Sequence, residues 1–143
     1  MADPNVKALV DGLNDDLAHE YAAVIQYRTY ASTVTGPYRQ ELRQFFTGEI
    51  ADELGHAQLL ADKIIVLGGR PATQAADVRF TDEPRQMLEN SLEDEVATIE
   101  RYIRRRAQAE EAGEIGLAVD LDTVIADETK HRDELRLMLK RWP

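Results

Sequence analysis

Cysteine is absent from the sequence, which excludes disulfides, zinc knuckles and rubredoxin-type iron centres and leaves the redox compartment open. Long hydrophobic runs are absent as well: no run of about 18 apolar residues occurs, so we expect no membrane-spanning helix and no membrane partner. The first five residues lack a basic segment followed by an apolar one, which argues against a secretory signal. We therefore expect a cytoplasmic protein.

Positive charge is scarce. The chain has 17 Lys and Arg residues against 27 Asp and Glu residues, a net charge of -10. An acidic surface disfavours nucleic acid as a partner and favours cations. The length of 143 residues, with 43% hydrophobic and 31% charged residues, predicts one globular domain over residues 1–143.

Glycine and proline are sparse, and they separate four long segments in which apolar residues recur at spacings of three and four. We expect helices over residues 3–35, 38–67, 81–112 and 114–141, the first of them capped by Asp3. The short first and last connections predict two antiparallel hairpins, and the longer connection over residues 68–80 predicts a crossover along the bundle. The expected fold is therefore an all-α four-helix bundle.

Several residues are expected to play ordinary structural roles. The inward stripe of the third helix is expected to comprise Leu88, Leu92, Val96, Ile99 and Ile103. The run Arg104-Arg105-Arg106 is expected to form a solvated face near the end of that helix. His19 is expected to point outward, since it lies about 100° around the first helix from Glu20.

Two of the three histidines follow a glutamate by three positions, in the pairs Glu53 and His56 and Glu128 and His131. Positions i and i+3 share a helix face, so each pair can converge on one point. A single Glu-x-x-His is weak evidence of a metal site, because both residue types are common on solvated helices. Two such pairs at matching positions are stronger evidence of a metal site.

The spacing of the two pairs indicates an internal repeat. The second pair follows the first by a fixed number of residues, which we call the repeat interval. Glu95 follows Glu20 by the same interval. Glu20 therefore precedes Glu53 by as many positions as Glu95 precedes Glu128. In an antiparallel hairpin, residues equidistant from the turn lie level. The midpoint of Glu20 and Glu53 falls at the first glycine-proline break, and that of Glu95 and Glu128 falls just before the glycine of the last turn. If the two hairpins pack about a pseudo-two-fold axis, all six side chains meet at mid-bundle.

Each of the four glutamates falls on an apolar stripe, where an ionised carboxylate is costly unless it is paired or metal-bound. Four gathered carboxylates would also repel one another. Two divalent cations would cancel the four charges, and two neutral imidazoles would complete the ligand set. Carboxylate and imidazole ligands without thiolate suit iron or manganese better than a structural zinc.

At these residues the chain resembles the ferritin-like superfamily of di-iron carboxylate proteins, and bacterioferritin most of all. The stretches that carry the resemblance are His19-Glu20-Tyr21 through Gln26-Tyr27, Asp52 to Ala57, and Asp127 to His131. The resemblance implies two iron ions, with manganese as the alternative. It makes Glu20 and Glu95 terminal ligands, Glu53 and Glu128 bridging and catalytic ligands, and His56 and His131 ligands of one metal each. Tyr27 matches a tyrosine beside the family's site and is a third catalytic candidate; the alternative is an ordinary core tyrosine.

The chain also departs from bacterioferritin. Leu54 replaces the methionine that binds haem in that family, so no Met-ligated haem is expected. Leu60 and Glu134 stand where the family has aromatic residues, which leaves a radical relay in doubt. Gly48 replaces a histidine used in interior iron handling, and only Asp52 of that pair remains. The family's short fifth helix is expected to be missing, which leaves a cage and its size open.

Three functional hypotheses follow. The first is a di-iron ferroxidase that oxidises Fe(II) to Fe(III) with O2 or H2O2 for iron storage or detoxification, as a homo-oligomer. The second is a related iron or manganese oxidase or peroxidase of the rubrerythrin-like kind, which needs no cage. The third is a non-catalytic helical interaction module in which the six residues are vestigial or exposed.

Overall fold

The computed structural model describes residues 3–143, and in this range it contains helices and no strand. Residues 1 and 2 of the expected domain lie outside the described residues. The helices are α1 (Pro4–Thr33), α2 (Arg39–Val66), α3 (Pro84–Glu111) and α4 (Ile115–Lys140). The prediction of an all-α four-helix bundle is confirmed.

Local chemistry sets the helix ends. The Asp3 carboxylate accepts a hydrogen bond from the backbone N–H of Asn5 at 2.9 Å, and Pro4 occupies the first position of α1. Helix α3 begins at Pro84, later than predicted. Glu83 is extended, as the residue before a proline prefers to be, and its N–H donates to the Thr81 hydroxyl.

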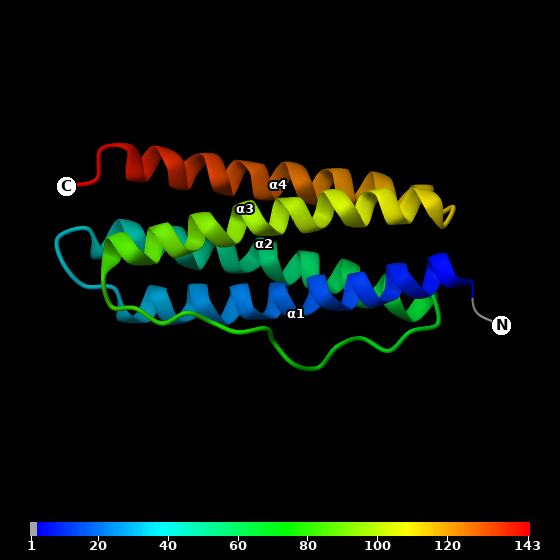
Figure 1. Ribbon diagram of the computed structural model, residues 1–143. Helices are drawn as coiled ribbons and strands as arrows, with labels where there is room; N and C mark the ends of the chain where they lie inside the picture. Colours follow the sequence, from blue (N-terminus) through cyan, green and yellow to red (C-terminus); the bar gives the residue numbers. More distant parts are fainter. Residues whose placement is uncertain (1–2) are drawn as a thin grey trace.

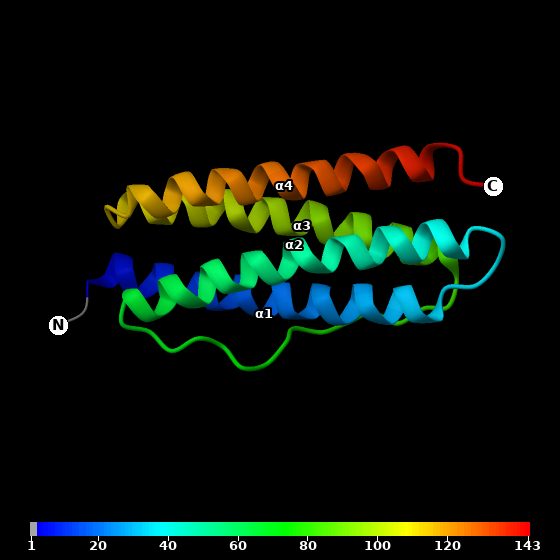
Figure 2. The ribbon, with the colours of Figure 1, turned by 180° about the vertical axis from the view of Figure 1, so that it is seen from behind.

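The helices pair as two antiparallel hairpins, α1 with α2 and α3 with α4, while α2 and α3 run in the same direction (Figure 1). The connection between α2 and α3 runs along the length of the bundle beside α1, as the view from behind also shows (Figure 2). It is fastened to α1, because Ala76 donates to the Ala18 carbonyl at 2.9 Å and the Asn14 side chain bonds the backbone of Arg70 and Ala72. The predicted crossover is therefore confirmed.

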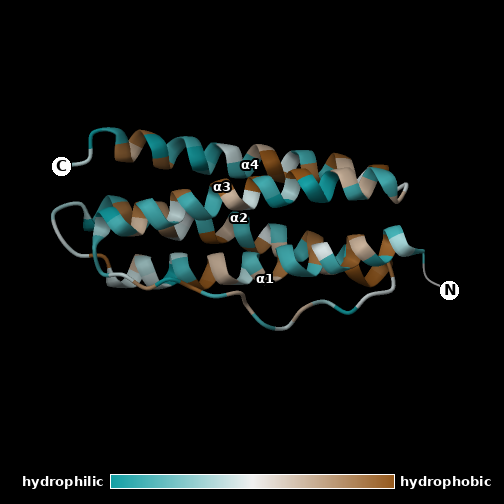
Figure 3. Cartoon of the chain, viewed as in Figure 1, coloured by the Kyte–Doolittle hydropathy of each residue, from teal (hydrophilic) through white to brown (hydrophobic). Residues whose placement is uncertain are grey.

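The core consists of two apolar clusters, one toward each end of the bundle. Leu13, Leu60 and Leu121 belong to the first cluster, and Tyr30 and Phe46 to the second. Along each helix, the predicted acidic residue lies between members of the two clusters. Hydrophobic and hydrophilic segments alternate along the helices (Figure 3). None of the helices within residues 3–143 has the length and apolarity that a membrane span requires.

Two predictions for α3 were wrong. Ile103 is 54% exposed, and its neighbour Tyr102 takes the inward position. Arg105, predicted to be solvated, is 7% exposed and donates to both carboxylate oxygens of Asp16 on α1, at 2.8 and 3.1 Å. Its guanidinium lies against Gly12, where an added Cβ would come within 2.0 Å of Nη1. The absent side chain of Gly12 makes room for this buried ion pair.

Candidate metal centre

All four helices contribute to one buried cluster between the two apolar clusters. The structure brings together all six residues singled out in the sequence, each of them 6% exposed or less. Their nitrogen and oxygen atoms form two groups of four, within 4.8 Å of one another in each group. The first group comprises Glu20, Glu53, His56 and Glu128, and the second comprises Glu53, Glu95, Glu128 and His131. Glu53 and Glu128 belong to both groups, as residues that bridge two ions would.

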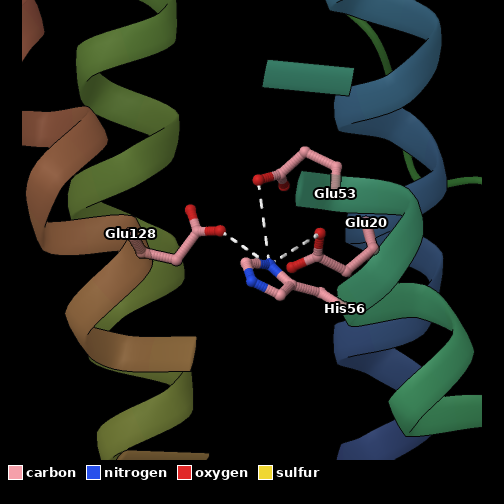
Figure 4. Close-up of side chains that lie close together, drawn as sticks. All are labelled: Glu20, Glu53, His56 and Glu128. Atoms are coloured by element: carbon pink, nitrogen blue, oxygen red, sulfur yellow. Dashed lines mark ion pairs between the residues drawn. The ribbon is translucent and has the colours of Figure 1, made fainter. Parts of the chain in front are cut away.

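Three carboxylates surround the Nδ1 atom of His56 (Figure 4). Oε1 of Glu128 lies at 2.9 Å, and Oε2 of Glu20 and Oε1 of Glu53 both lie at 3.8 Å. These carboxylates come from α4, α1 and α2, so one point inside the bundle is reached from three helices.

The second group has the same design around Nδ1 of His131. Oε1 of Glu53 and Oε1 of Glu95 lie at 3.6 Å from this atom, and Oε2 of Glu128 lies at 3.8 Å. The two groups therefore share the Glu53 Oε1 atom, while Glu128 turns a different oxygen toward each imidazole.

The outer nitrogen of each imidazole contacts an aspartate of the opposite hairpin. Nε2 of His56 lies 3.1 Å from Asp127, and Nε2 of His131 lies 2.8 Å from Asp52. Such a contact fixes the ring so that Nδ1 faces the cluster. Each aspartate directly precedes the glutamate of a Glu-x-x-His pair, and the repeat interval separates these two residues as well, so the repeat contained a signal for both.

Two tyrosines hold the glutamates that belong to a single group. Tyr27 donates to Oε1 of Glu95 at 2.7 Å, and Tyr102 donates to Oε1 of Glu20 at 2.5 Å. Burial, together with the nearby carboxylates, raises the pKa of both phenols well above 10, which keeps them protonated as donors. Sequence reasoning did not assign Tyr102 to the site, although this residue follows Tyr27 by the repeat interval.

Several buried atoms of the cluster have no hydrogen-bond partner with acceptable geometry among the described residues, although charged atoms are close. They include Oε2 of Glu20 and of Glu95, Oε1 of Glu53, both carboxylate oxygens of Glu128, and Nδ1 of both histidines. Buried polar atoms without partners are costly. All of these atoms are oxygen or imidazole nitrogen, the donors that suit iron and manganese, so the residues fit two divalent cations.

Protonation reflects the same crowding of charge. Burial raises the pKa of Glu53 and Glu128 well above 4.5, and the neighbouring glutamates add to the shift. Burial lowers the pKa of His56 and His131, but the surrounding carboxylates outweigh it and raise these values to about 11 and about 12. Protons therefore neutralise the cluster when cations do not.

A further acid, Glu49, lies at the edge of the cluster and was not predicted. Its Oε2 atom is 2.7 Å from Nδ1 of His131 and has no hydrogen-bond partner of acceptable geometry. It precedes Glu53 by one helical turn, but it has no acidic counterpart in the other half of the repeat. Only the structure shows its proximity to His131.

A cavity of about 550 Å³ reaches the cluster from the side of α1 and α3. Its lining includes Tyr27, Glu53 and Glu95, together with Asp94 and His19. His19 is not a member of either group; its ring nitrogen Nδ1 lies 2.8 Å from the carbonyl oxygen of Asp15, one turn earlier on α1. The cavity thus borders Glu95 and Glu53 of the cluster.

Comparisons with known proteins agree with this geometry. The "Ferritin-like domain" family matches residues 10–143. The bacterioferritin of Streptomyces coelicolor is 30% identical over 138 residues, covering 96% of this chain and 81% of the relative. A ferritin-like di-iron carboxylate protein of Bacillus anthracis superposes with a TM-score of 0.94 at 47% identity, covering 96% and 99% of the two chains. The Desulfovibrio desulfuricans bacterioferritin, described with a di-iron site in different catalytic states, has a TM-score of 0.86 at 26% identity, covering 95% and 80%.

Proposed function

Since this chain belongs to the ferritin-like domain family, we propose that it is a di-iron ferroxidase, which oxidises Fe(II) to Fe(III) with O2 or H2O2 for iron storage or detoxification. One observation carries the proposal. Six buried residues form two groups of four that share two glutamates, and seven of their oxygen and nitrogen atoms have no hydrogen-bond partner of acceptable geometry among the described residues. Two divalent cations would satisfy these atoms and cancel the charge of four carboxylates.

The proposed ligand roles follow the grouping of the residues. Glu53 and Glu128, which belong to both groups, bridge the two ions, while Glu20 and Glu95 are terminal ligands. His56 and His131 each bind one ion through Nδ1.

The surrounding residues prepare the ligands for binding. Tyr102 and Tyr27 occupy Oε1 of the two terminal glutamates, which leaves Oε2 of Glu20 and of Glu95 free for a cation. Asp127 and Asp52 hold the outer nitrogens of the histidines and so keep Nδ1 turned inward. When bound, the ferrous ions supply the electrons that reduce the oxidant. The carboxylates and imidazoles release their protons as the cations enter.

Two alternatives stay open within the proposal. The oxidant is either O2 or H2O2, and the protein is either a storage assembly or a stand-alone iron or manganese oxidase or peroxidase. The stand-alone alternative is favoured by one observation: a single chain supplies all six donors, so the chemistry needs no partner subunit. An interaction module is disfavoured, because the six residues are buried together and not exposed. Of the storage assembly and the stand-alone enzyme, we propose the storage assembly, a homo-oligomer that stores iron.

An anaerobic titration of the metal-free protein with Fe(II), followed by rapid mixing with O2 or H2O2, tests the proposal. We expect two ferrous ions per chain and fast oxidation, and a parallel titration with Mn(II) identifies the preferred metal. The mass of the assembly, measured by size-exclusion chromatography with light scattering, separates a storage shell from a dimeric enzyme. Failure to bind two ions, or oxidation no faster than that of free Fe(II), would refute the proposed activity.

A further inference from the structure

The two halves of the cluster are nearly equivalent, and one residue breaks the equivalence. The aspartates, glutamates and histidines of the cluster, and its two tyrosines, all recur at the repeat interval. Glu49 does not, because the residue that follows it by the repeat interval is Val124. Both are buried, at 9% and 4% exposed. One half of the repeat therefore places a carboxylate where the other half places methyl groups.

Glu49 is aimed at one metal position. Its Oε2 lies 2.7 Å from Nδ1 of His131, closer than the nearest atoms of Glu53, Glu95 and Glu128, which lie at 3.6 to 3.8 Å. That oxygen is buried and has no hydrogen-bond partner of acceptable geometry. A cation that replaces the proton on Nδ1 of His131 would therefore lie within reach of this oxygen.

The other position gains no comparable carboxylate. Asp16 precedes Glu20 by one helical turn, as Glu49 precedes Glu53, but both Asp16 oxygens accept hydrogen bonds from Arg105. Its charge is thereby neutralised within the protein. In the part of the chain that the structure describes, His56 faces only the three glutamates of its group and Asp127.

We propose that the two metal positions are inequivalent, and that the position at His131, with Glu49 as an additional carboxylate donor, binds a divalent cation first and more tightly than the position at His56. This inference rests on the proposed function, because it assumes that the cluster binds two ions. An added anionic oxygen in a buried site strengthens the binding of a hard divalent cation. The cavity on the α1 and α3 side also reaches Glu95, which belongs only to the His131 group, and does not reach Glu20.

Titration of the metal-free protein with Co(II), monitored by calorimetry and by visible absorption, tests this inference without requiring activity. The wild-type protein should bind two ions per chain in two steps, the first at least about tenfold tighter than the second. His131→Ala should remove the tighter step, and His56→Ala the weaker one. The variant Glu49→Gln keeps the size of the side chain but removes its charge, so it should weaken the first step by about tenfold and leave the second unchanged.

Glu41→Gln is the matched control, because Glu41 is an exposed acid on the same helix, and it should leave both steps unchanged. Far-UV circular dichroism verifies that each variant is folded. Repulsion between two bound ions can by itself produce two steps, so the Glu49→Gln variant is decisive. An unchanged isotherm in that variant, or loss of the weaker step in His131→Ala, would overturn the inequivalence while leaving the two-metal proposal intact. Absence of two bound ions in the wild-type protein would instead refute the proposed function.

Discussion

Glu128 has two carboxylate oxygens, and neither has a hydrogen-bond partner of acceptable geometry in the described part of the chain, although the residue is 0% exposed. Oε1 lies 2.9 Å from Nδ1 of His56, and Oε2 lies 3.8 Å from Nδ1 of His131. The carboxylate thus spans the two histidines. Burying both oxygens of one carboxylate between two imidazoles is costly in a protein without cations, whereas a bridging ligand requires this arrangement.

Replacing Glu128 should therefore remove activity before it removes the fold. We expect Glu128→Ala to slow Fe(II) oxidation by at least about 100-fold, since changes beyond the ligands themselves already cost about 10–100-fold in many metal sites. The helical circular dichroism should be retained, because burying the Glu128 carboxylate is costly in the metal-free protein and its removal relieves that cost. Stopped-flow absorption measures the rate. Glu134→Ala, at an exposed position of the same helix, is the control, and near-normal kinetics in Glu128→Ala would exclude the bridging role.

Tyr102 allows a test at a residue that is not itself a ligand. Its hydroxyl donates to Oε1 of Glu20 at 2.5 Å, and both residues are buried. Hydrogen bonds to charged groups contribute about 1.5–3 kcal/mol, so Tyr102→Phe should lower the free energy of unfolding of the metal-free protein by about that amount. Urea denaturation measures it. Tyr21→Phe, at a half-buried position on α1, should have a much smaller effect, and equal effects would show that the Tyr102 hydroxyl is unimportant.

At the level of the helices, local sequence signals were sufficient for most of the fold. Spacing, the Asp3 cap and the glycine and proline breaks are local features, so the four helices and the crossover could be predicted to within a few residues. The inward face of α3 could not be predicted as well. The exposure of Ile103 and the burial of Arg105 depend on packing partners that are distant in the sequence.

The residues of the cluster likewise divide into those that the sequence predicts and those that only the structure shows. The internal repeat relates the four glutamates and two histidines that the structure brings together, and it also relates Tyr27 to Tyr102 and Asp52 to Asp127. Glu49 has no counterpart in the repeat, so no sequence pattern distinguishes it from a surface acid. Its contact with His131 appears only when α2 packs beside α4.

The packing of α1 against α3 at Gly12 predicts a change in stability opposite in sign to the one that helix propensity predicts. Helix propensity alone would make a Gly→Ala change in a helix stabilising by about 1 kcal/mol. At Gly12 the new methyl group would collide with the Arg105 guanidinium, which is held by Asp16. We therefore expect Gly12→Ala to destabilise the protein by about 1–3 kcal/mol, the usual cost of overpacking.

Chemical denaturation of Gly12→Ala and of Gly48→Ala provides the comparison. Gly48 lies within α2, and an added Cβ there meets nothing within 4 Å, so its replacement should stabilise the protein slightly. Stabilisation of both variants to the same extent would mean that Arg105 does not depend on the space at Gly12.

For the whole molecule, the buried cluster couples stability to pH and to metal. The folded metal-free protein raises the pKa of Glu53 and Glu128 well above 4.5 and those of His56 and His131 to about 11 and about 12. The native state therefore binds more protons than the unfolded chain above about pH 4.5. The stability from these groups is fully present at low pH and is lost as the pH rises through their folded-state values.

Metal reverses this dependence, because cations replace the protons. We expect the Tm of the metal-free protein to fall between about pH 6 and about pH 8, and the increase in Tm caused by Mn(II) to grow over the same range. Differential scanning calorimetry in the two states measures both trends. A metal-induced increase in Tm that shrinks as the pH rises would show that the cations bind elsewhere, at surface acids that are already ionised.

The location of the bound ions tests the central claim most directly. Anomalous diffraction at the iron absorption edge, recorded from crystals loaded with Fe(II) under argon, reports metal positions without reference to activity. We expect two peaks about 3.5–4 Å apart inside the bundle, one beside His56 and one beside His131, with Glu53 and Glu128 touching both. Iron found only on the acidic surface, with no peak among the six residues, would contradict it.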